Sequence, residues 1–163
     1  MIMKKKKLNI KILAITAFIS FIADLISKEI ISSSMSLRES IPVFDQVLKI
    51  TYIKNNGIAF GLFQDFPNIL LVISIIVVIV IFYLIKSLAN QNVQTHLAFG
   101  LILGGAFGNI LDRIRFQSVR DFIDVGINYK LRWPIFNIAD SVVLIGVIML
   151  LIYYDKTRDT EGL

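Results

Sequence analysis

The sequence predicts a membrane all-α fold, a four-transmembrane-helix bundle with a small extracytoplasmic β region. Apolar residues make up 56% of the chain and charged residues 18%, whereas a soluble domain is usually about 45–50% apolar and about 25% charged. Four stretches are long and apolar enough to cross roughly 30 Å of hydrocarbon, which takes about 20 helical residues. The polar segments between them show strand patterning. We expect a single integral membrane domain over residues 1–163.

The first two predicted spans cover about 12–31 and 66–85. The first is interrupted by one acid and one base, and the second is almost unbroken Ile, Leu, Val and Phe. Asp65 is expected to cap the second span. Pro67 suits the first turn of a helix, because the N–H that proline lacks would have no partner in the helix at that position.

The third and fourth predicted spans cover about 97–114 and 135–154, and the fourth opens after a proline. In the third span Gly100, Gly104 and Gly108 recur at four-residue spacing, on one face of a helix. Small residues at this spacing are typical of close helix packing. The glycines do not form a phosphate-binding loop, because the lysine and the serine or threonine of that motif do not follow them.

Basic residues set the expected orientation of the chain. A cluster lies just before the first span, and it comprises Lys4, Lys5, Lys6, Lys7 and Lys11. Such clusters stay in the cytoplasm, and four spans would return the C-terminus to the same side. The full count of Lys and Arg on the two sides of the membrane adds little support to this orientation. A cleavable signal peptide is an alternative, but the apolar run is long, carries an acid–base pair and is not followed by an A-x-A site.

Two segments are expected to form β structure outside the membrane. Within 32–65, the stretch from Val47 to Ile53 alternates loosely between apolar and polar residues, which is typical of a strand. Segment 115–134 is similar, with a turn predicted at 126–128. Tyr129 and Trp133 stand where an interfacial aromatic belt is expected. Together these segments are expected to form a β platform on the membrane.

Composition limits the chemistry available to the chain. It has no cysteine and one histidine, His96, which excludes disulfides, thiol nucleophiles, iron–sulfur clusters and cysteine–histidine zinc sites. His96 opens the third span at its inner end, where we expect a structural role. Catalysis would therefore use Asp, Glu, Ser, Lys or Tyr. The net charge of +5 favours anionic lipid headgroups over nucleic acid as partners, because the chain is so apolar.

Polar residues of three predicted spans converge on one boundary of the bilayer. Ionisable residues inside spans are costly and usually face a partner or an aqueous cavity. Here they fall at the outward ends of the first and third spans and at the start of the fourth, which runs back inward. The residues are Asp24, Lys28, Asn109, Asp112, Arg113, Asn137, Asp140 and Ser141.

Each group also has a purely structural interpretation. Asp24 and Lys28 have the i,i+4 spacing, acid first, that favours a helix salt bridge. Asp140 could simply be buried and hydrogen-bonded. Asp121 and Asp124 lie three residues apart in a predicted strand, where successive side chains point to opposite faces. Only one of these two acids is therefore expected to face the cluster.

Five short motifs, in order along nearly the whole chain, match one family. They are Asp24-Leu-Ile-Ser-Lys28, Asn55-Asn-Gly-Ile-Ala-Phe60, Gly104-Gly-Ala-Phe-Gly-Asn-Ile-Leu-Asp-Arg113, Val119-Arg-Asp-Phe122 and Phe136-Asn-Ile-Ala-Asp-Ser141. In these motifs the sequence resembles the lipoprotein signal peptidases (signal peptidase II). One departure is Arg120, at a position where the resemblance leads us to expect an apolar residue.

The resemblance implies an aspartyl endopeptidase of the bacterial cytoplasmic (inner) membrane, with its active site near the outer face. Its substrates would be prolipoproteins carrying a diacylglyceryl-modified cysteine, cut just before that cysteine to release the signal peptide. By motif position the catalytic dyad falls on Asp121 and Asp140. The supporting or substrate-binding positions are Asp24, Lys28, Asn55, Gly57, Gly108, Asn109, Asp112, Arg113, Asn137 and Ser141. No metal or cofactor is expected, the partners are these prolipoproteins and membrane lipids, and a monomer suffices.

Three other classes of function fit parts of the pattern. A proton-coupled transporter would favour acids near mid-membrane and symmetry between the two halves, and neither is evident. A serine–lysine peptidase would use Ser27, Ser141 or Lys28, but Ser27 and Lys28 are adjacent on a helix and point in different directions. A non-enzymatic assembly subunit would explain the glycine stripe and leave the clustered acids unexplained.

Overall fold

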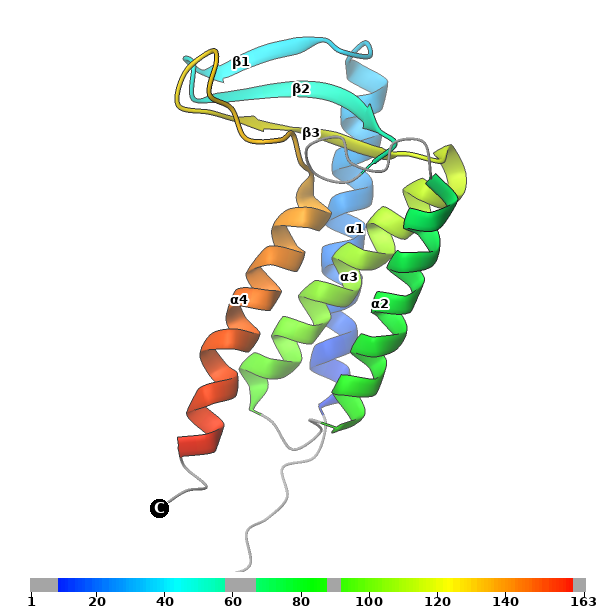
Figure 1. Ribbon diagram of the computed structural model, residues 1–163, viewed down its shortest axis with the longest axis vertical. Helices are drawn as coiled ribbons and strands as arrows, with labels where there is room; N and C mark the ends of the chain where they lie inside the picture. The colour runs from blue at the N-terminus through cyan, green and yellow to red at the C-terminus, as the bar shows by residue number, and fades with distance from the viewer. Residues whose placement is uncertain (1–8, 58–66, 88–91, 160–163) are drawn as a thin grey trace, which may run out of the picture.

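The computed structural model describes residues 9–57, 67–87 and 92–159, which form four helices and one sheet (Figure 1). In chain order the elements are α1 (Ile10–Ser34), β1 (Ser40–Phe44), β2 (Leu48–Asn55), α2 (Pro67–Ser87), α3 (Val93–Phe116), β3 (Val119–Val125) and α4 (Ile138–Asp159). Each predicted span therefore falls on a helix. The predicted strand at 47–53 corresponds to β2, and segment 115–134 contains β3.

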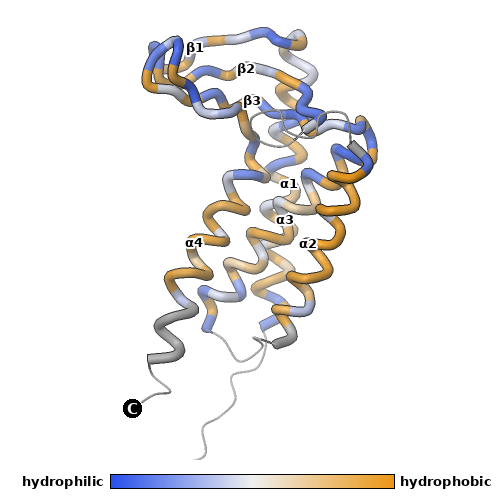
Figure 2. The backbone as a smooth tube through the Cα atoms, in the orientation of Figure 1, coloured by the Kyte–Doolittle hydropathy of each residue, from blue (hydrophilic) through white to orange (hydrophobic). Residues whose placement is uncertain are grey.

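The helices pack around α3, which contacts α1, α2 and α4. Between α2 and α3 the buried apolar side chains form one core cluster: Val78, Ile81 and Ile85 from α2 and Phe99, Ile102 and Leu103 from α3. Many other large apolar side chains of α2 point outward, among them Ile76, Ile79 and Phe82. A helix that is apolar on all sides belongs in a protein interior or in lipid. The outward-facing side chains therefore suit a hydrocarbon environment. Figure 2 shows that hydrophobic residues run along most of α2.

Three of the described helices are long and apolar enough to cross a membrane, over Ile10–Ser34, Asn68–Ile85 and Val93–Phe116. The apolar part of α4, Ile138–Tyr153, is shorter. The fold is thus a helical membrane fold with a small antiparallel sheet. Whether α4 also spans the bilayer stays a prediction.

Glycines set the distance between α3 and the helices on either side of it. A Cβ at Gly100 or Gly104 would collide with backbone carbonyls of α1, and one at Gly108 would collide with the Asp24 carboxylate. The predicted packing stripe is confirmed. A fourth glycine, Gly105, faces α4, where a Cβ would meet the carbonyl of Ala139. The first turn of α4 consequently lies directly against the backbone of α3.

The sheet lies across one end of the helix bundle, with strand order β1-β2-β3 and antiparallel pairing (Figure 1). In its register Asp121 of β3 pairs with Ile53 of β2. The chain then turns back, and the predicted turn near 126–128 closes with the Asn128 side chain accepting from the N–H groups of Lys130 and Leu131. Backbone hydrogen bonds between Ile123 and Phe136 then bring the chain to the start of α4.

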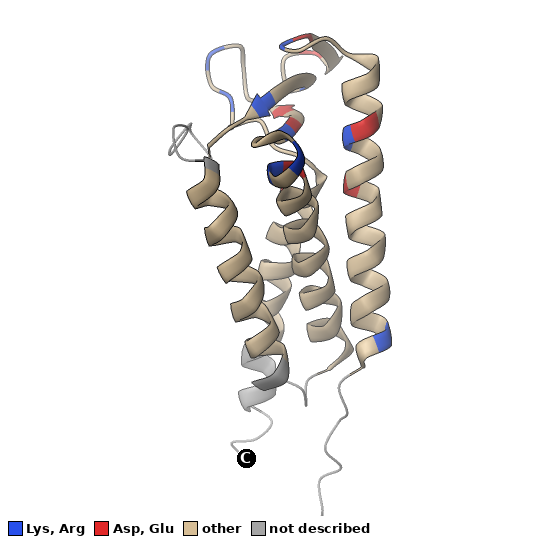
Figure 3. Cartoon of the chain, turned by 90° about the vertical axis from the view of Figure 1, so that its right-hand side faces the viewer, with Lys and Arg blue, Asp and Glu red and all other residues tan. Residues whose placement is uncertain are grey.

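Among the described residues, the charged ones gather mainly at the end of the bundle that carries the sheet (Figure 3). Several sequence-based expectations lie outside the described residues. They are the cytoplasmic lysine cluster at 4–7, the Asp65 cap and the last three residues of the motif at 55–60. The orientation of the chain across the membrane remains a prediction.

We predict that Gly105→Ala lowers the thermal unfolding midpoint measured in detergent. The added methyl would meet the Ala139 carbonyl and two valine side chains of α4, and overpacking of this kind typically costs about 1–3 kcal/mol. The matched control is Ala14→Val, which adds more carbon on an exposed face of α1 and should leave the midpoint unchanged. Equal midpoints for Gly105→Ala and the wild type would contradict this account of the contact.

Candidate active site

A cavity of about 230 Å³ opens where the sheet meets the ends of α3 and α4. Two carboxylates, those of Asp121 and Asp140, lie in its wall. The other lining residues are Asn55, Gly57, Asn109, Arg113, Val119, Trp133, Pro134, Ile135 and Phe136. The cavity thus combines two acids, three other polar side chains and an apolar rim.

Asp121 is a buried acid of β3 that lines the cavity, with a side chain only 2% exposed. Its carboxylate accepts hydrogen bonds from Asn55 Nδ2 at 2.9 Å and from Asn137 Nδ2 at 2.7 Å. Burial, followed by repulsion from Asp140, raises the pKa of Asp121 to about 7, although the two asparagine bonds oppose the rise. A carboxyl group with this pKa can hold or release a proton near neutral pH.

Asp140 lies in the first turn of α4 and takes part in the cap of that helix. Asn137 Oδ1 accepts from the Asp140 N–H at 2.9 Å, and one Asp140 carboxylate oxygen accepts from the Asn137 N–H at 3.3 Å. This reciprocal pair is a capping box, in which two otherwise unpaired helix donors are satisfied at once. The other carboxylate oxygen accepts from Asn109 Nδ2 at 2.8 Å.

Two asparagines connect the two acids. Asn137 Nδ2 donates to Asp121 and also, at 3.1 Å, to Asn109 Oδ1. Asn109 in turn donates to Asp140. Because each amide has its oxygen and nitrogen engaged with different partners, neither can rotate without losing a hydrogen bond. The connection therefore holds both carboxylates in fixed orientations at the cavity.

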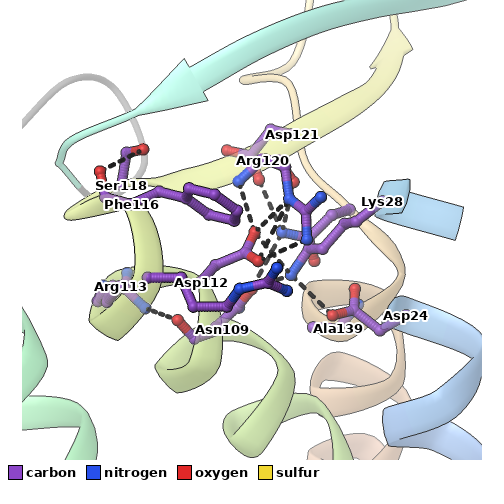
Figure 4. A network of polar contacts seen from close by, with 12 residues as sticks. Asp24, Lys28, Asn109, Asp112, Arg113, Phe116, Ser118, Arg120, Asp121 and Ala139 are labelled. Atoms are coloured by element: carbon purple, nitrogen blue, oxygen red, sulfur yellow. Dashed lines mark hydrogen bonds and ion pairs between the residues drawn. The ribbon is translucent and has the colours of Figure 1, made fainter. Parts of the chain in front are cut away.

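Next to Asn109 of the cavity wall lies a buried cation, Lys28 (Figure 4). Its ammonium lies 2.7 Å from the Asp24 carboxylate and 3.6 Å from that of Asp112, and it donates to Asn109 Oδ1 at 2.9 Å. The predicted salt bridge between Asp24 and Lys28 is confirmed. The other Asp24 oxygen accepts from the Ala139 N–H at 2.9 Å, so this acid joins α1 to the start of α4.

The remaining predicted positions differ in how close they come to the cavity. Arg113 lines it and donates to the Asn109 carbonyl at 3.5 Å. The Gly57 N–H donates to Asn55 Oδ1 at 3.0 Å and so orients that amide. Ser141 lies outside the lining and donates to the Asn137 carbonyl of its own helix at 2.9 Å. Ser27 likewise donates to a carbonyl of its own helix, so neither serine is hydrogen-bonded to the lysine that a serine–lysine pair would need.

The two acids of β3 have different partners, as the alternation of the strand predicted. Asp124 accepts from Arg132 Nε at 2.5 Å and from Thr51 Oγ1 at 2.8 Å, on the side of the strand away from the cavity. His96 also has the expected structural surroundings. It is buried at the opposite end of α3, where its ring nitrogens pair with the Asn9 N–H and the Asn92 carbonyl.

Sequence reasoning missed two features of the site. The first is the cavity wall from Trp133 to Phe136, where the sequence predicts only an interfacial belt and a helix start, because the position of this segment depends on long-range strand pairing. The second is the role of Arg120, which the sequence marked only as a departure from the apolar residue expected at its position. Arg120 is 2% exposed and forms an ion pair with Asp112 at 2.9 Å, and an arginine directly beside a candidate acid was the available signal.

Comparison with known proteins agrees with the geometry. The family model described as signal peptidase (SPase) II matches residues 16–155. Relatives named lipoprotein signal peptidase include one from Wigglesworthia glossinidia brevipalpis, 42% identical over 93% of this chain and 95% of its own. Another, from Bacillus velezensis, is 44% identical over 89% of this chain and 95% of its own.

Solved structures agree as well. One described as a bacterial membrane enzyme has a TM-score of 0.85 and 35% sequence identity, over 98% of this chain and 96% of its own. A second with the same description has a TM-score of 0.79 and 37% identity, over 91% of this chain and 96% of its own. The chain therefore belongs to the signal peptidase II family.

Proposed function

We propose that this protein is a bacterial lipoprotein signal peptidase that works with an aspartate dyad, Asp121 and Asp140. It removes the signal peptide from a prolipoprotein by cutting just before a diacylglyceryl-modified cysteine. The observation that carries the proposal is the placement of both carboxylates in one cavity wall, linked through Asn137 and Asn109. Family membership supplies the substrate class, since the relatives are named lipoprotein signal peptidases.

The dyad carries out the reaction with one shared proton. Because the pKa of Asp121 is raised to about 7 by burial and by Asp140, one carboxyl stays protonated near neutral pH while the other is ionised. The ionised carboxylate takes a proton from a water molecule while the oxygen of that water attacks the scissile carbonyl carbon. The protonated carboxyl donates its proton to the carbonyl oxygen. Collapse of the tetrahedral intermediate breaks the C–N bond, and the leaving amine receives a proton from the dyad. The pair titrates as a unit, so neither acid is assigned as the base.

The surrounding amides keep the dyad ready for this reaction. Asn55 and Asn137 donate to one acid, and Asn109 donates to the other. Donors that are already oriented need no rearrangement as charge moves between the carboxyls, which is the main source of electrostatic catalysis in a buried site. Arg113 also lines the cavity and adds a positive charge to the wall that carries the two acids.

The site's place in the fold suits a lipid-modified substrate. In this proposal the sheet end faces away from the cytoplasm, and the cavity lies level with the ends of the helices. The diacylglyceryl tails of the substrate can then remain in the bilayer while the bond before the cysteine reaches the dyad. The apolar wall at residues 133–136 borders the same opening.

We predict that Asp121→Asn and Asp140→Asn each abolish cleavage, because either change removes a carboxyl that must exchange a proton. Asp124→Asn should be much milder, since Asp124 pairs with Arg132 away from the cavity. The assay incubates purified protein in lipid with a diacylglyceryl-modified prolipoprotein and, as the substrate control, with its unmodified precursor. Only the lipidated form should be cut. Full loss in Asp124→Asn together with retained activity in Asp121→Asn would overturn the assignment.

A second prediction concerns stability as a function of pH. The raised pKa of Asp121 means that its contribution to stability is fully present below the unfolded value, near about 4. The contribution is lost as the pH rises through about 7. Asp121→Asn has no such group to ionise. The difference in the free energy of unfolding should therefore shift in favour of the variant between about pH 4 and pH 7, at up to about 1.4 kcal/mol per pH unit, and should level off above that range.

The control for the pH series is Ser141→Ala, which exchanges two groups that do not ionise. The free energy of unfolding of Ser141→Ala should differ from that of the wild type by a constant amount across the same pH range. Asp121→Asn also removes a hydrogen-bond acceptor, which changes the free energy of unfolding by the same amount at every pH and does not change its slope with pH. A difference that stays flat with pH would contradict the raised pKa.

A further inference from the structure

Arg120 is a buried arginine with a full set of partners. Its side chain is 2% exposed, and its guanidinium donates to Asp112 through Nε and through Nη2, the latter at 2.9 Å. The remaining nitrogen, Nη1, lies 3.1 Å from both Ser32 Oγ and Glu29 Oε1, and the group stacks on the Phe116 ring at 4.9 Å. A planar fork with several donors suits this arrangement, and a lysine could not reproduce it.

The partner of Arg120, Asp112, lies between two buried cations. The guanidinium of Arg120 binds it closely, at 2.9 Å, while the ammonium of Lys28 lies farther away, at 3.6 Å. The backbone N–H of Arg120 also donates to Asp112 at 3.0 Å. The negative charge of Asp112 is therefore satisfied chiefly by Arg120, and it does not draw the lysine away from its other partners.

Those other partners of Lys28 lead to the dyad. The ammonium lies 2.7 Å from Asp24 and donates to Asn109 Oδ1 at 2.9 Å. With its oxygen held in this way, the Asn109 amide directs its nitrogen at Asp140. A chain of contacts thus runs from Arg120 through Asp112 and Lys28 to Asn109 (Figure 4). Asn109 continues it to the carboxylate of Asp140 in the cavity wall.

We propose that Arg120 is a positioning residue for the peptidase reaction. Because Arg120 neutralises Asp112, Lys28 stays bound to Asp24 and Asn109. Asn109 therefore stays oriented toward Asp140. This inference rests on the proposed function of the dyad. Arg120 is not among the residues that line the cavity, so it acts through other side chains and does not touch the substrate.

The test compares the kinetics of Arg120→Leu and the wild type on the lipidated prolipoprotein. Without the arginine, Asp112 draws Lys28 toward itself, and Asn109 Oδ1 loses the hydrogen bond from Lys28 and keeps only the one from Asn137. Small losses of alignment at a reacting group cost up to about 100-fold, so kcat should fall about 10- to 100-fold while KM stays within about twofold. A raised KM with unchanged kcat, or wild-type values for both, would overturn the proposal.

Arg115→Leu is the matched control. Arg115 also forms an ion pair with Glu29, at 3.3 Å, and also stacks on Phe116, at 5.0 Å, but its side chain is 47% exposed. Its removal deletes the same charge next to two of the same partners, and kcat should remain at the wild-type value. An equal loss of kcat in both variants would mean that the effect comes from removing a positive charge beside Glu29 and not from the contact with Asp112, and the proposal would fail.

A double-mutant cycle keeps the test decisive if Arg120→Leu does not fold. Because removing one partner of a buried ion pair leaves a bare charge, the arginine change is repeated in the Asp112→Asn background, where no such charge remains. If Arg120 acts through Asp112, the double variant has the kcat of Asp112→Asn alone, within about threefold. A further fall of about tenfold or more would overturn the proposal. Asp121→Asn is assayed alongside, and activity in that variant would refute the dyad itself instead.

Discussion

The buried ammonium of Lys28 is the charge on which the sheet end of this fold depends. An isolated charge in an apolar interior costs many kcal/mol, so it is tolerated only with close partners. Here those partners come from different places: Asp24 is on its own helix, while Asn109 and Asp112 are on α3. Asp24 also binds the first turn of α4. Satisfying one cation therefore fixes three helices relative to one another.

That arrangement requires helices that approach closely, and the glycines of α3 allow it. Gly108 leaves room for the Asp24 carboxylate, and Gly105 leaves room for the carbonyl of Ala139, next to Asp140. With larger residues at these points the acid and the helix start would be pushed away from α3. The packing of small residues and the polar contacts of the cavity are thus two parts of one constraint, which joins the stability of the bundle to the geometry of the proposed dyad.

Sequence reasoning predicted the features that depend on local periodicity. Helical spans, the alternation that separates Asp121 from Asp124, and the salt bridge of Asp24 with Lys28 all follow from spacing along one element. Features that depend on pairing between distant segments could not be found that way. The backbone bonds between Ile123 and Phe136 start α4 at Ile138, three residues later than expected. The burial of Arg120 requires Asp112 on another element, which a pattern along β3 alone does not reveal.

One feature of the cavity gives the protein a reporter of its own. Trp133 lines the cavity that holds the two carboxylates, and it is the chain's single tryptophan. All intrinsic indole fluorescence therefore originates at this wall. A peptide or lipid that enters the opening changes the polarity around the indole ring, and the emission spectrum responds without any attached dye. Occupancy can thus be followed optically in an inactive dyad variant, where binding is separated from turnover.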